Sequence, residues 1–490
     1  MILRALKWVL LLLGLLLAVL AVNTLRQGSR QISVEPLPRI ALDEAGAAQS
    51  LSAAVRTKTI SGLLDPSGQA REFEALHAHL KARYPLVHSS LERETIGALT
   101  LVFTWRGQDP KARPFALMAH QDVVPVAPGT EGLWKQPPFS GAIEGGFVWG
   151  RGAWDNKGNL IAQLEAIETL LKAGFQPRRT IYFIFGHDEE VGGRAGAVPV
   201  AAHFKQRQIA LDFVLDEGLL VTEGILPGAA MPIALIGVAE KGSISLQLVA
   251  QAVPGHSSMP PAPGSSAIGM LSAALARLDG KPLPGGISGV AGEMFGALAP
   301  EMNGFQRVAL SNLWLFGPLI ERMLGKAPTT NALLRTTTAL TIVNAGNKEN
   351  VLPGRAEAVV NFRILPGDTS ESVLAFVKAA IADERIEVRV LGQAFEASRV
   401  SSSQSEAYRL LASSVREVFA GSVVVPGLML AATDARHFEG LADHVYRFTP
   451  LRAGPKDLSL FHGTGERIAV AGLADMVRFY HRLLSQAAGR

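Results

Sequence analysis

Short apolar runs alternate with a helix-like segment over residues 99–215, and this alternation constrains the fold more than any other feature. The segment 160–171 has a helical pattern, and Gly174 follows it as a stop signal. The runs with the length and apolar content of buried strands are 99–104, 115–119, 180–185 and 213–215. Strands that alternate with helices predict an α/β fold, with a mostly parallel sheet and helices on both faces.

A second pattern begins near Lys241, where the strand-like segments become half exposed. These segments are 243–250, 336–343, 356–364 and 386–391, and helical patterns cover 265–278 and 370–383. Their order, βαββαβ, predicts a small ferredoxin-like α+β unit inserted into the larger domain. The segment 284–332 is additional and apolar. We expect it to form helices packed over the inserted unit. The alternative interpretations are that it lines an acyl-binding channel or contacts a membrane.

The composition is that of a globular protein. Of the 490 residues, 48% are hydrophobic and 18% are charged, which excludes intrinsic disorder. The net charge is only +4 and no basic cluster is interleaved with aromatic residues, so we expect no nucleic-acid partner. The chain has no cysteine, so no thiolate competes as a metal ligand and disulfides do not indicate a compartment.

The segment 8–22 is uncharged and apolar, and Arg4 and Lys7 precede it. Its length lies between that of a signal-peptide core and that of a membrane-spanning helix. Residues 19–21 form a weak cleavage site, so we favour an uncleaved membrane anchor over a cleaved signal peptide. With either, we expect the main body to be exported, as a periplasmic or other extracytoplasmic protein or as a secreted one.

Acidic and histidine side chains follow several predicted strands. His120, Glu190 and Asp216 fall at strand ends, where ligands bind in open α/β sheets. Asp155 and His462 lie in glycine-rich turns. Each residue alone also fits an ordinary turn or helix cap. Together, their carboxylates and imidazoles predict a site for two divalent metals such as zinc.

Two neighbouring residues suit supporting chemistry. In an extended segment, Asp122 lies on the same side as His120 and can accept a hydrogen bond from its second ring nitrogen. Glu189 and Glu190 are adjacent carboxylates, which repel each other unless a cation or proton intervenes. One can bind metal while the other acts as a general base, although a solvated acidic turn is the alternative.

The motifs around these residues resemble the zinc-dependent aminoacylase, carboxypeptidase S and glutamate carboxypeptidase family of metallopeptidases. The matching segments are 118–125, 150–158, 186–193, 215–218, 254–258, 350–353, 361–364 and 461–463. Trp134, 137–141 and 186–187 point to the carboxypeptidase S-like branch, which includes N-fatty-acyl amino acid hydrolases. The resemblance implies two Zn²⁺ ions, with Mn²⁺ or Co²⁺ as alternatives.

The resemblance also implies a role for each candidate residue. His120 and Asp216 would bind one ion, and Glu190 and His462 the other. Asp155 would bridge the two ions, with a cis peptide bond after it.

Three roles concern the substrate. Glu189 would be the general base that takes a proton from the attacking water and returns it to the leaving amine. His256 would stabilise the oxyanion, either from the partner subunit of a homodimer or from a lid. Arg363 would pair with a substrate carboxylate. Without the resemblance, His256 fits a turn and Arg363 a surface strand.

We therefore predict a di-zinc metallohydrolase that cleaves an amide bond next to a free carboxylate, as a carboxypeptidase or dipeptidase on short peptides. An N-acyl (fatty-acyl) amino acid amidohydrolase is one alternative, and a non-catalytic membrane-tethered binding protein is another. No Gly-x-Ser-x-Gly motif indicates a serine hydrolase. The expected parts are a signal anchor or signal peptide (1–25), a linker (26–50), a catalytic domain in two pieces (51–239 and 396–490) and an inserted lid or dimerisation domain (240–395).

Overall fold

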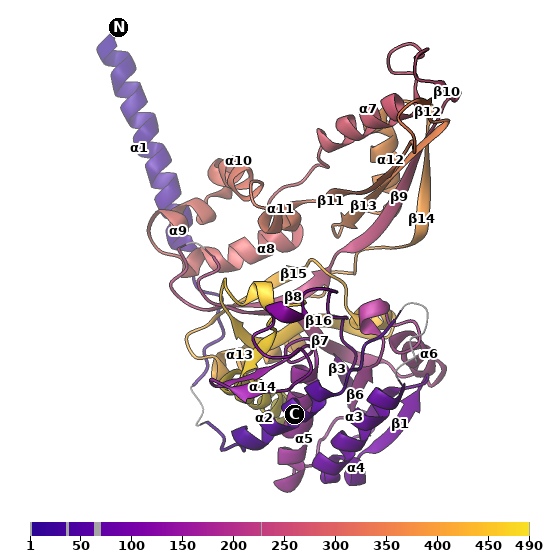
Figure 1. Ribbon diagram of the computed structural model, residues 1–490. Coiled ribbons are helices and arrows are strands. Elements are labelled where there is room, and N and C mark those ends of the chain that lie inside the picture. Colours follow the sequence, from indigo (N-terminus) through magenta and orange to yellow (C-terminus); the bar gives the residue numbers. More distant parts are fainter. Residues whose placement is uncertain (1, 36–38, 63–69, 227, 490) are drawn as a thin grey trace.

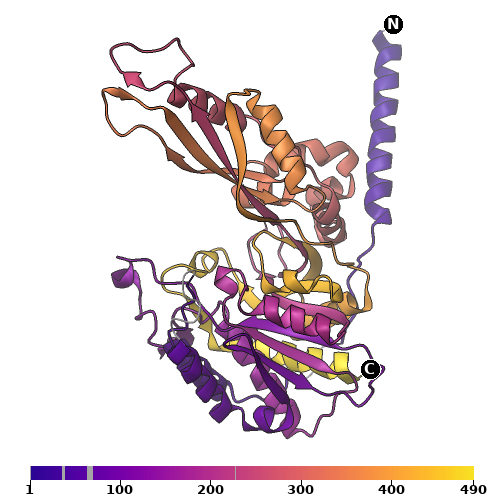
Figure 2. The ribbon, with the colours of Figure 1, turned by 90° about the vertical axis from the view of Figure 1, so that its right-hand side faces the viewer.

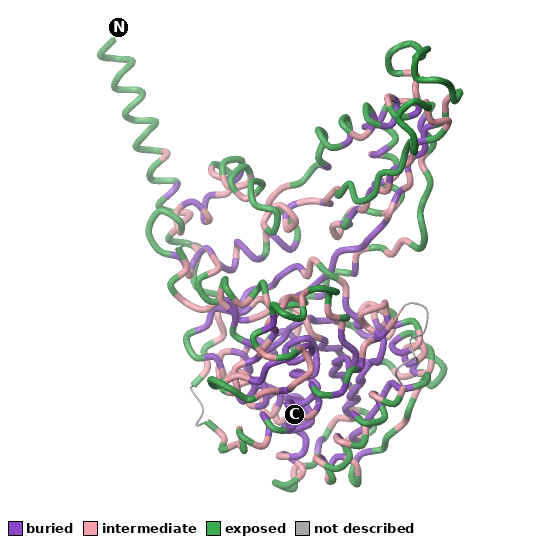
Figure 3. Tube along the Cα trace, in the orientation of Figure 1, coloured by how far each residue is buried: buried purple, intermediate pink, exposed green. Residues whose placement is uncertain are grey.

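The computed structural model describes residues 2–35, 39–62, 70–226 and 228–489. Figure 1 shows a larger layered body, an elongated second unit joined to it, and the N-terminal helix α1 (Ile2–Arg26) projecting outward. Buried residues gather in the larger body, whereas α1 and the far end of the second unit are exposed (Figure 3).

In the described part of the chain, the larger body contains an eight-stranded sheet ordered β1-β2-β6-β3-β7-β16-β8-β15. Strand β3 is parallel to β6 and β7, β7 to β16, and β8 to β15, whereas β1 and β2 add an antiparallel edge. The strands are β1 (Glu92–Ile96), β2 (Thr100–Trp105), β3 (Phe115–His120), β6 (Ile181–Gly186), β7 (Leu211–Thr222), β8 (Ile233–Glu240), β15 (Val423–Met429) and β16 (Ala442–Ala453). The predicted mostly parallel α/β sheet is confirmed.

Helices cover both faces of this sheet, which explains why its central strands are apolar throughout. In β3, Phe115 and Leu117 pack in one core cluster with α5 and α14, whereas Ala116 and Met118 pack in another with α6. Burial of each large apolar side chain contributes about 1.5–3 kcal/mol and holds the strand ends in place. The helices of this body are α2 (Glu44–Arg56), α3 (Ala70–Arg83), α4 (Pro85–Ser90), α5 (Lys157–Lys172), α6 (Ala197–Gln206), α13 (Glu406–Val418) and α14 (Val470–Gly489).

The second unit is a four-stranded antiparallel sheet ordered β11-β13-β9-β14, with two helices on one face. Its elements occur in the predicted order βαββαβ and are β9 (Gly242–Gln251), α7 (Ala267–Asp279), β11 (Thr337–Asn344), β13 (Arg355–Ile364), α12 (Ser370–Ile381) and β14 (Ile386–Phe395). A short pair, β10 (Gly255–His256) and β12 (Val351–Leu352), lies at the end away from the larger body (Figures 1 and 2).

The apolar segment 284–332 forms helices, as expected, but α8 does not pack over the inserted unit. Met294 and Phe295 of α8 share a core cluster with Val423 and Val425 of β15. Ile233 of β8 and Val423 and Val425 of β15 need apolar cover at this end of the sheet, and α8 supplies it. The helices are α8 (Gly289–Leu298), α9 (Gly304–Ser311), α10 (Leu313–Leu324) and α11 (Pro328–Leu334).

Candidate metal centre

Polar side chains gather where β3 and β6 end, beside the middle of β7. Asp216, expected at a strand end, lies within β7, which continues to Thr222. His120 is the last residue of β3 and pairs with Gly186, the last residue of β6. The turn that carries Glu189 and Glu190 therefore begins beside His120. The neighbouring strand β7 brings Asp216 to the same edge of the sheet. This is the carboxyl edge of the parallel strands, where binding sites form in open α/β folds.

Asp155 lies between two histidines that are far apart in the sequence. Its Oδ1 is 3.0 Å from His120 Nε2, and its Oδ2 is 2.7 Å from His462 Nε2. His462 Nε2 is also 3.4 Å from Glu190 Oε1. The Asp155–Asn156 peptide bond is cis. Because each oxygen of Asp155 faces a different imidazole, the carboxylate has the geometry of a bridge between two cations.

The structure brings Glu217, rather than Asp216, to His120. Glu217 Oε1 lies 3.2 Å from His120 Nε2, and its other oxygen accepts a hydrogen bond from Asn156. Asp216 instead accepts hydrogen bonds from the backbone N–H groups of Glu217 and Ala435, each at 2.9 Å. Each oxygen of Asp216 therefore already accepts one hydrogen bond within the protein.

A bulge in β7 explains this exchange. The register between β7 and β16 shifts between Arg447 and Phe448, which leaves Glu217 and Gly218 without partners on β16. A Cβ atom at Gly218 would collide with the side chain of Arg447, so glycine permits the close approach of the two strands. The bulge turns Glu217 toward His120.

Asp122 holds the Glu189–Glu190 turn and the His120 ring in place. Its two carboxylate oxygens accept hydrogen bonds from the backbone N–H groups of Glu189 (3.2 Å) and Glu190 (3.1 Å), and Ser61 Oγ donates at 2.6 Å. His120 Nδ1 lies 3.0 Å from the Asp122 carbonyl oxygen and 3.3 Å from its Oδ1. Both groups accept, so Nδ1 carries the proton and Nε2 is free to bind a cation.

A buried ion pair that sequence reasoning missed joins the two glycine-rich turns. Glu466 Oε1 accepts hydrogen bonds from the backbone of Trp154 (2.9 Å) and Asp155 (3.1 Å), and its Oε2 is 2.6 Å from Arg151 Nη1. Arg151 also donates to the carbonyl oxygen of His462 at 3.0 Å. Pairing of β5 (Phe147–Trp149) with β17 (Arg467–Ala469) brings these turns together. Glu466 and Arg151 therefore position Asp155 and His462.

We expect Glu466→Ala to lower stability by about 3–5 kcal/mol, because it leaves the buried Arg151 guanidinium unpaired. Metal affinity should fall with it, since the Asp155 turn loses its anchor. Chemical denaturation and metal titration measure both effects. Glu387→Ala is the matched control, because it breaks the exposed Glu387–Arg389 pair and should change neither quantity appreciably. Equal stability of the two variants would contradict the positioning role.

The electrostatics of the centre favour a bound cation. Burial raises the pKa of Glu189 well above its usual range, and it raises the pKa of Glu217 to about 8. Burial alone would raise the pKa of Asp155, but hydrogen bonds with His120 and His462 lower it overall. In turn, the hydrogen bond with the Asp155 carboxylate raises the pKa of His462 to about 10. Crowded carboxylates retain protons unless a cation neutralises them. Their oxygens and the imidazole nitrogens are donors that a divalent cation such as zinc accepts.

Two groups of potential ligands are compact enough to hold an ion. Among the described residues, the ligand atoms of His120, Asp155 and Glu190 lie within 4.8 Å of one another, and so do those of His120, Glu189 and Glu217. The residues present therefore fit a metal centre.

A loop after β15 also contacts the centre and was not predicted. Ala435 donates its N–H to Asp216, and Arg436 Nη2 donates to the Gly192 carbonyl oxygen at 3.1 Å. Asp434 is buried, and among the described residues neither of its carboxylate oxygens has a hydrogen-bond partner. These polar residues follow the apolar run 423–432 in the sequence, so the signal that identified His120 was also available here.

The two substrate-binding candidates lie outside this cluster. His256 is in β10, at the exposed far end of the inserted unit (Figures 1 and 2), and its Nδ1 lies 2.8 Å from Ser258 Oγ. Arg363 is exposed near the end of β13, where it pairs with Ser243 of β9 and Thr337 of β11. Within one copy of the chain in this conformation, His256 does not reach the centre.

The chain combines a mostly parallel sheet, an inserted α+β unit and a carboxylate–imidazole cluster that could hold a metal. Residues 116–486 match the family model of Peptidase family M20/M25/M40. The chain belongs to this family, and it is an enzyme of the metallopeptidase or amidohydrolase type.

Relatives and solved structures agree with this assignment. The chain is 41% identical over 484 residues to "Probable carboxypeptidase S-like 2" of Dictyostelium discoideum, covering 97% of this chain and 92% of the relative. It is 40% identical over 463 residues to an "N-fatty-acyl-amino acid synthase/hydrolase" of Mus musculus, covering 92% and 88%. The crystal structure of an M20 family metallo-carboxypeptidase from Sulfolobus solfataricus shares the fold, with a TM-score of 0.62 at 18% identity over 91% of this chain and 99% of that one.

Proposed function

We propose that this enzyme hydrolyses an amide bond whose amine side is an amino acid with a free carboxylate, at a centre of two zinc ions. The observation that carries the proposal is Asp155, whose two oxygens face the imidazoles of His120 and His462. His120 and Glu217 would bind one ion, Glu190 and His462 the other, and Asp155 both. Glu217 replaces Asp216 in this assignment because Glu217 lies 3.2 Å from His120 Nε2, whereas each oxygen of Asp216 accepts a backbone N–H.

The protein's own groups supply the proton transfers. When bound, the two cations would polarise the scissile carbonyl and favour ionisation of a water. Glu189 stands beside the ligands, in the cluster with His120 and Glu217. Its carboxylate takes the proton of the attacking water and gives it to the leaving nitrogen. Asp122 contacts both the Glu189 backbone and the His120 ring, so one residue positions the general base Glu189 relative to the metal ligand His120.

His256 and Arg363 complete the proposal from the inserted unit. Arg363 would form a bidentate pair with the substrate carboxylate, and His256 would donate to the developing oxyanion. Because His256 lies at the far end of its own unit, either a partner copy in a homodimer or a closure of that unit would have to deliver it.

The acyl side of the substrate defines two candidates. The first is short peptides, with the enzyme as a carboxypeptidase or dipeptidase, and 41% identity to the carboxypeptidase S-like relative supports it. The second is N-acyl amino acids, supported by 40% identity to the N-fatty-acyl-amino acid synthase/hydrolase. Among the described residues, α1 is the one helix long and apolar enough to span a membrane. We propose that it anchors the enzyme with its body on the extracytoplasmic side.

We expect purified, zinc-loaded enzyme to release free amino acids from one of these two classes. Matched pairs such as Ala-Phe and N-oleoyl-Phe, which share the amine side, separate the classes by kcat/KM. The matched C-terminal amides lack the carboxylate and should be poor substrates. Equal cleavage of acids and amides would contradict the carboxylate requirement, and cleavage of neither would contradict the proposed activity.

A further inference from the structure

Helix α1 is held by a polar contact that a cleavable leader would not need. Asn312, fully buried between α9 and α10, places its Nδ2 3.3 Å from the Leu20 carbonyl oxygen and 3.3 Å from Thr24 Oγ1. Its Oδ1 accepts a hydrogen bond from Asn23 Nδ2 at 3.0 Å. Asn312 Nδ2 also donates to the Val308 carbonyl oxygen at 2.9 Å, so one buried amide connects the C-terminal part of α1 to α9.

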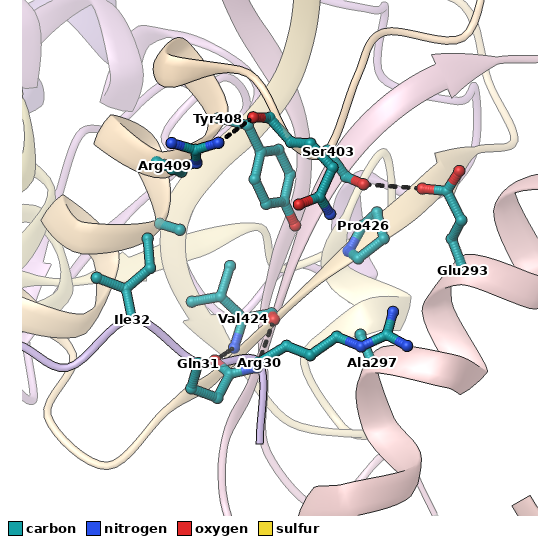
Figure 4. A pocket seen from close by; sticks show the side chains of 12 residues that line it. Arg30, Gln31, Ile32, Glu293, Ala297, Ser403, Tyr408, Arg409, Val424 and Pro426 are labelled. Carbon is teal, nitrogen blue, oxygen red and sulfur yellow. Dashed lines mark hydrogen bonds between the residues drawn. The ribbon is translucent and has the colours of Figure 1, made fainter. Parts of the chain in front are cut away.

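The residues after α1 are fixed to the larger body as well. Gln31 pairs with the free edge of β15, since its Nε2 donates to the Val424 carbonyl oxygen at 2.9 Å and its Oε1 accepts from the Val424 N–H at 2.8 Å. Figure 4 shows this contact in the pocket between β15, α8 and the chain after α1. Between the two contacts, Arg307 of α9 donates to the Gln27 carbonyl oxygen at 3.3 Å. The direction in which α1 leaves the body is therefore set by α9, α10 and β15.

The solvent-facing side of α10 is mostly apolar, with Arg322 as an exposed charge within it, whereas a helix on a water-soluble surface exposes mainly polar residues. Trp314, Leu315, Leu319 and Met323 are 59%, 40%, 54% and 62% exposed. They cover the outward half of the helix, with Trp314 and Met323 at its two margins and the exposed Arg322 among them. Phe305 of α9 continues the surface at 67% exposure. We call these five apolar residues the α9–α10 apolar face. A contiguous exposed apolar surface of this kind marks a contact with a partner or a membrane.

We propose that the α9–α10 apolar face inserts into the surface layer of the same bilayer that holds α1. The position of α10 next to α1 identifies the bilayer as the partner of this face. Helix α1 is apolar and exposed along nearly its whole length, and Asn312 fixes α10 beside the C-terminal end of α1. Figures 1 and 2 both place these helices next to the C-terminal half of α1. Any bilayer that covers α1 therefore also reaches α10.

The flanking charges agree with an interfacial position. Lys326 is exposed just after α10, Arg322 is exposed within the apolar face, and Arg26 and Arg30 are exposed where α1 ends. Cations beside an apolar face bind anionic headgroups, and a tryptophan such as Trp314 is favoured at the membrane–water boundary. Because α8 of the same segment packs on β15, this contact would orient the whole enzyme on the membrane.

Site-directed spin labelling tests the proposal on the full chain, which has no native cysteine. A nitroxide is attached to Leu319→Cys, and a control nitroxide to Glu371→Cys, exposed on α12. Both proteins are reconstituted in vesicles of phosphatidylcholine and phosphatidylglycerol, and collisions with oxygen and a water-soluble nickel chelate are measured. The label at 319 should be shielded from nickel about tenfold relative to 371 yet accessible to oxygen, since interfacial helices bury their apolar face about 5–10 Å deep.

Equal nickel access at 319 and 371 would overturn the proposal. Shielding at 319 from both reagents, with spin–spin broadening between labels, would assign the face to a second copy and would also overturn it. Adding Asn312→Ala to the Leu319→Cys protein should raise nickel access at 319, because α10 is released from α1. Unchanged access would show that Asn312 does not hold the two elements together.

Discussion

Glu189→Gln is expected to lower kcat for amide hydrolysis by about 10²–10⁴-fold, the usual contribution of a general acid–base group. The amide has the shape of the carboxylate but cannot accept the proton of the attacking water. The fold should be unaffected, because Asp122 holds residue 189 through its backbone N–H and not through its side chain. Metal binding should also persist, because the four proposed ligand partners and the bridging Asp155 remain.

Steady-state kinetics and elemental metal analysis of the same preparation check this expectation. Glu371→Gln, an exposed acid on α12, is the control and should behave as the wild type. A Glu189→Gln enzyme that keeps its metal and its kcat would refute the assignment of Glu189 as the base. A variant that loses its metal would instead make Glu189 a ligand.

Glu217→Gln should remove about one of two bound ions per chain and almost all activity, because a neutral amide is a poor ligand where a carboxylate balances the cation's charge. Asp216→Asn should keep both ions. It should instead lose about 1–3 kcal/mol of stability, because its amide cannot accept from both the Glu217 and the Ala435 N–H groups.

These neighbouring variants form a matched pair, since each changes one carboxylate to its amide within the same bulge of β7. Metal content under limiting zinc and thermal unfolding distinguish them. If Asp216→Asn loses an ion while Glu217→Gln retains both, the ligand is Asp216, as the sequence resemblance suggested.

Much of the fold could be predicted from sequence because burial on both sheet faces leaves a strong local signature. The runs at 115–119 and 180–185 are apolar throughout, and the structure places them as β3 and β6 at the sheet centre. The ends of such strands are equally visible, so His120 and Glu190 could be proposed as neighbours. Their proximity follows from parallel pairing, which the alternation of strands and helices implies.

The choice between Asp216 and Glu217 could not be made in this way. Adjacent residues in a strand face opposite sides, so a shift of one position exchanges their roles. That shift depends on the bulge opposite Arg447 and Phe448, residues more than 200 positions later in the chain. The Arg151–Glu466 pair was hidden for the same reason, because its partners meet only when β5 and β17 pair.

The sequence alone determined the layered α/β class, the inserted βαββαβ unit and the chemical type of the centre, since strand periodicity and ligand type are local properties. Only the tertiary structure decided which carboxylate faces His120, that Arg151 and Glu466 join the two glycine-rich turns, and that Asn312 connects α1 to α10. These contacts join segments that are distant in the chain. Their geometry is set by strand register and by packing, which no local pattern encodes.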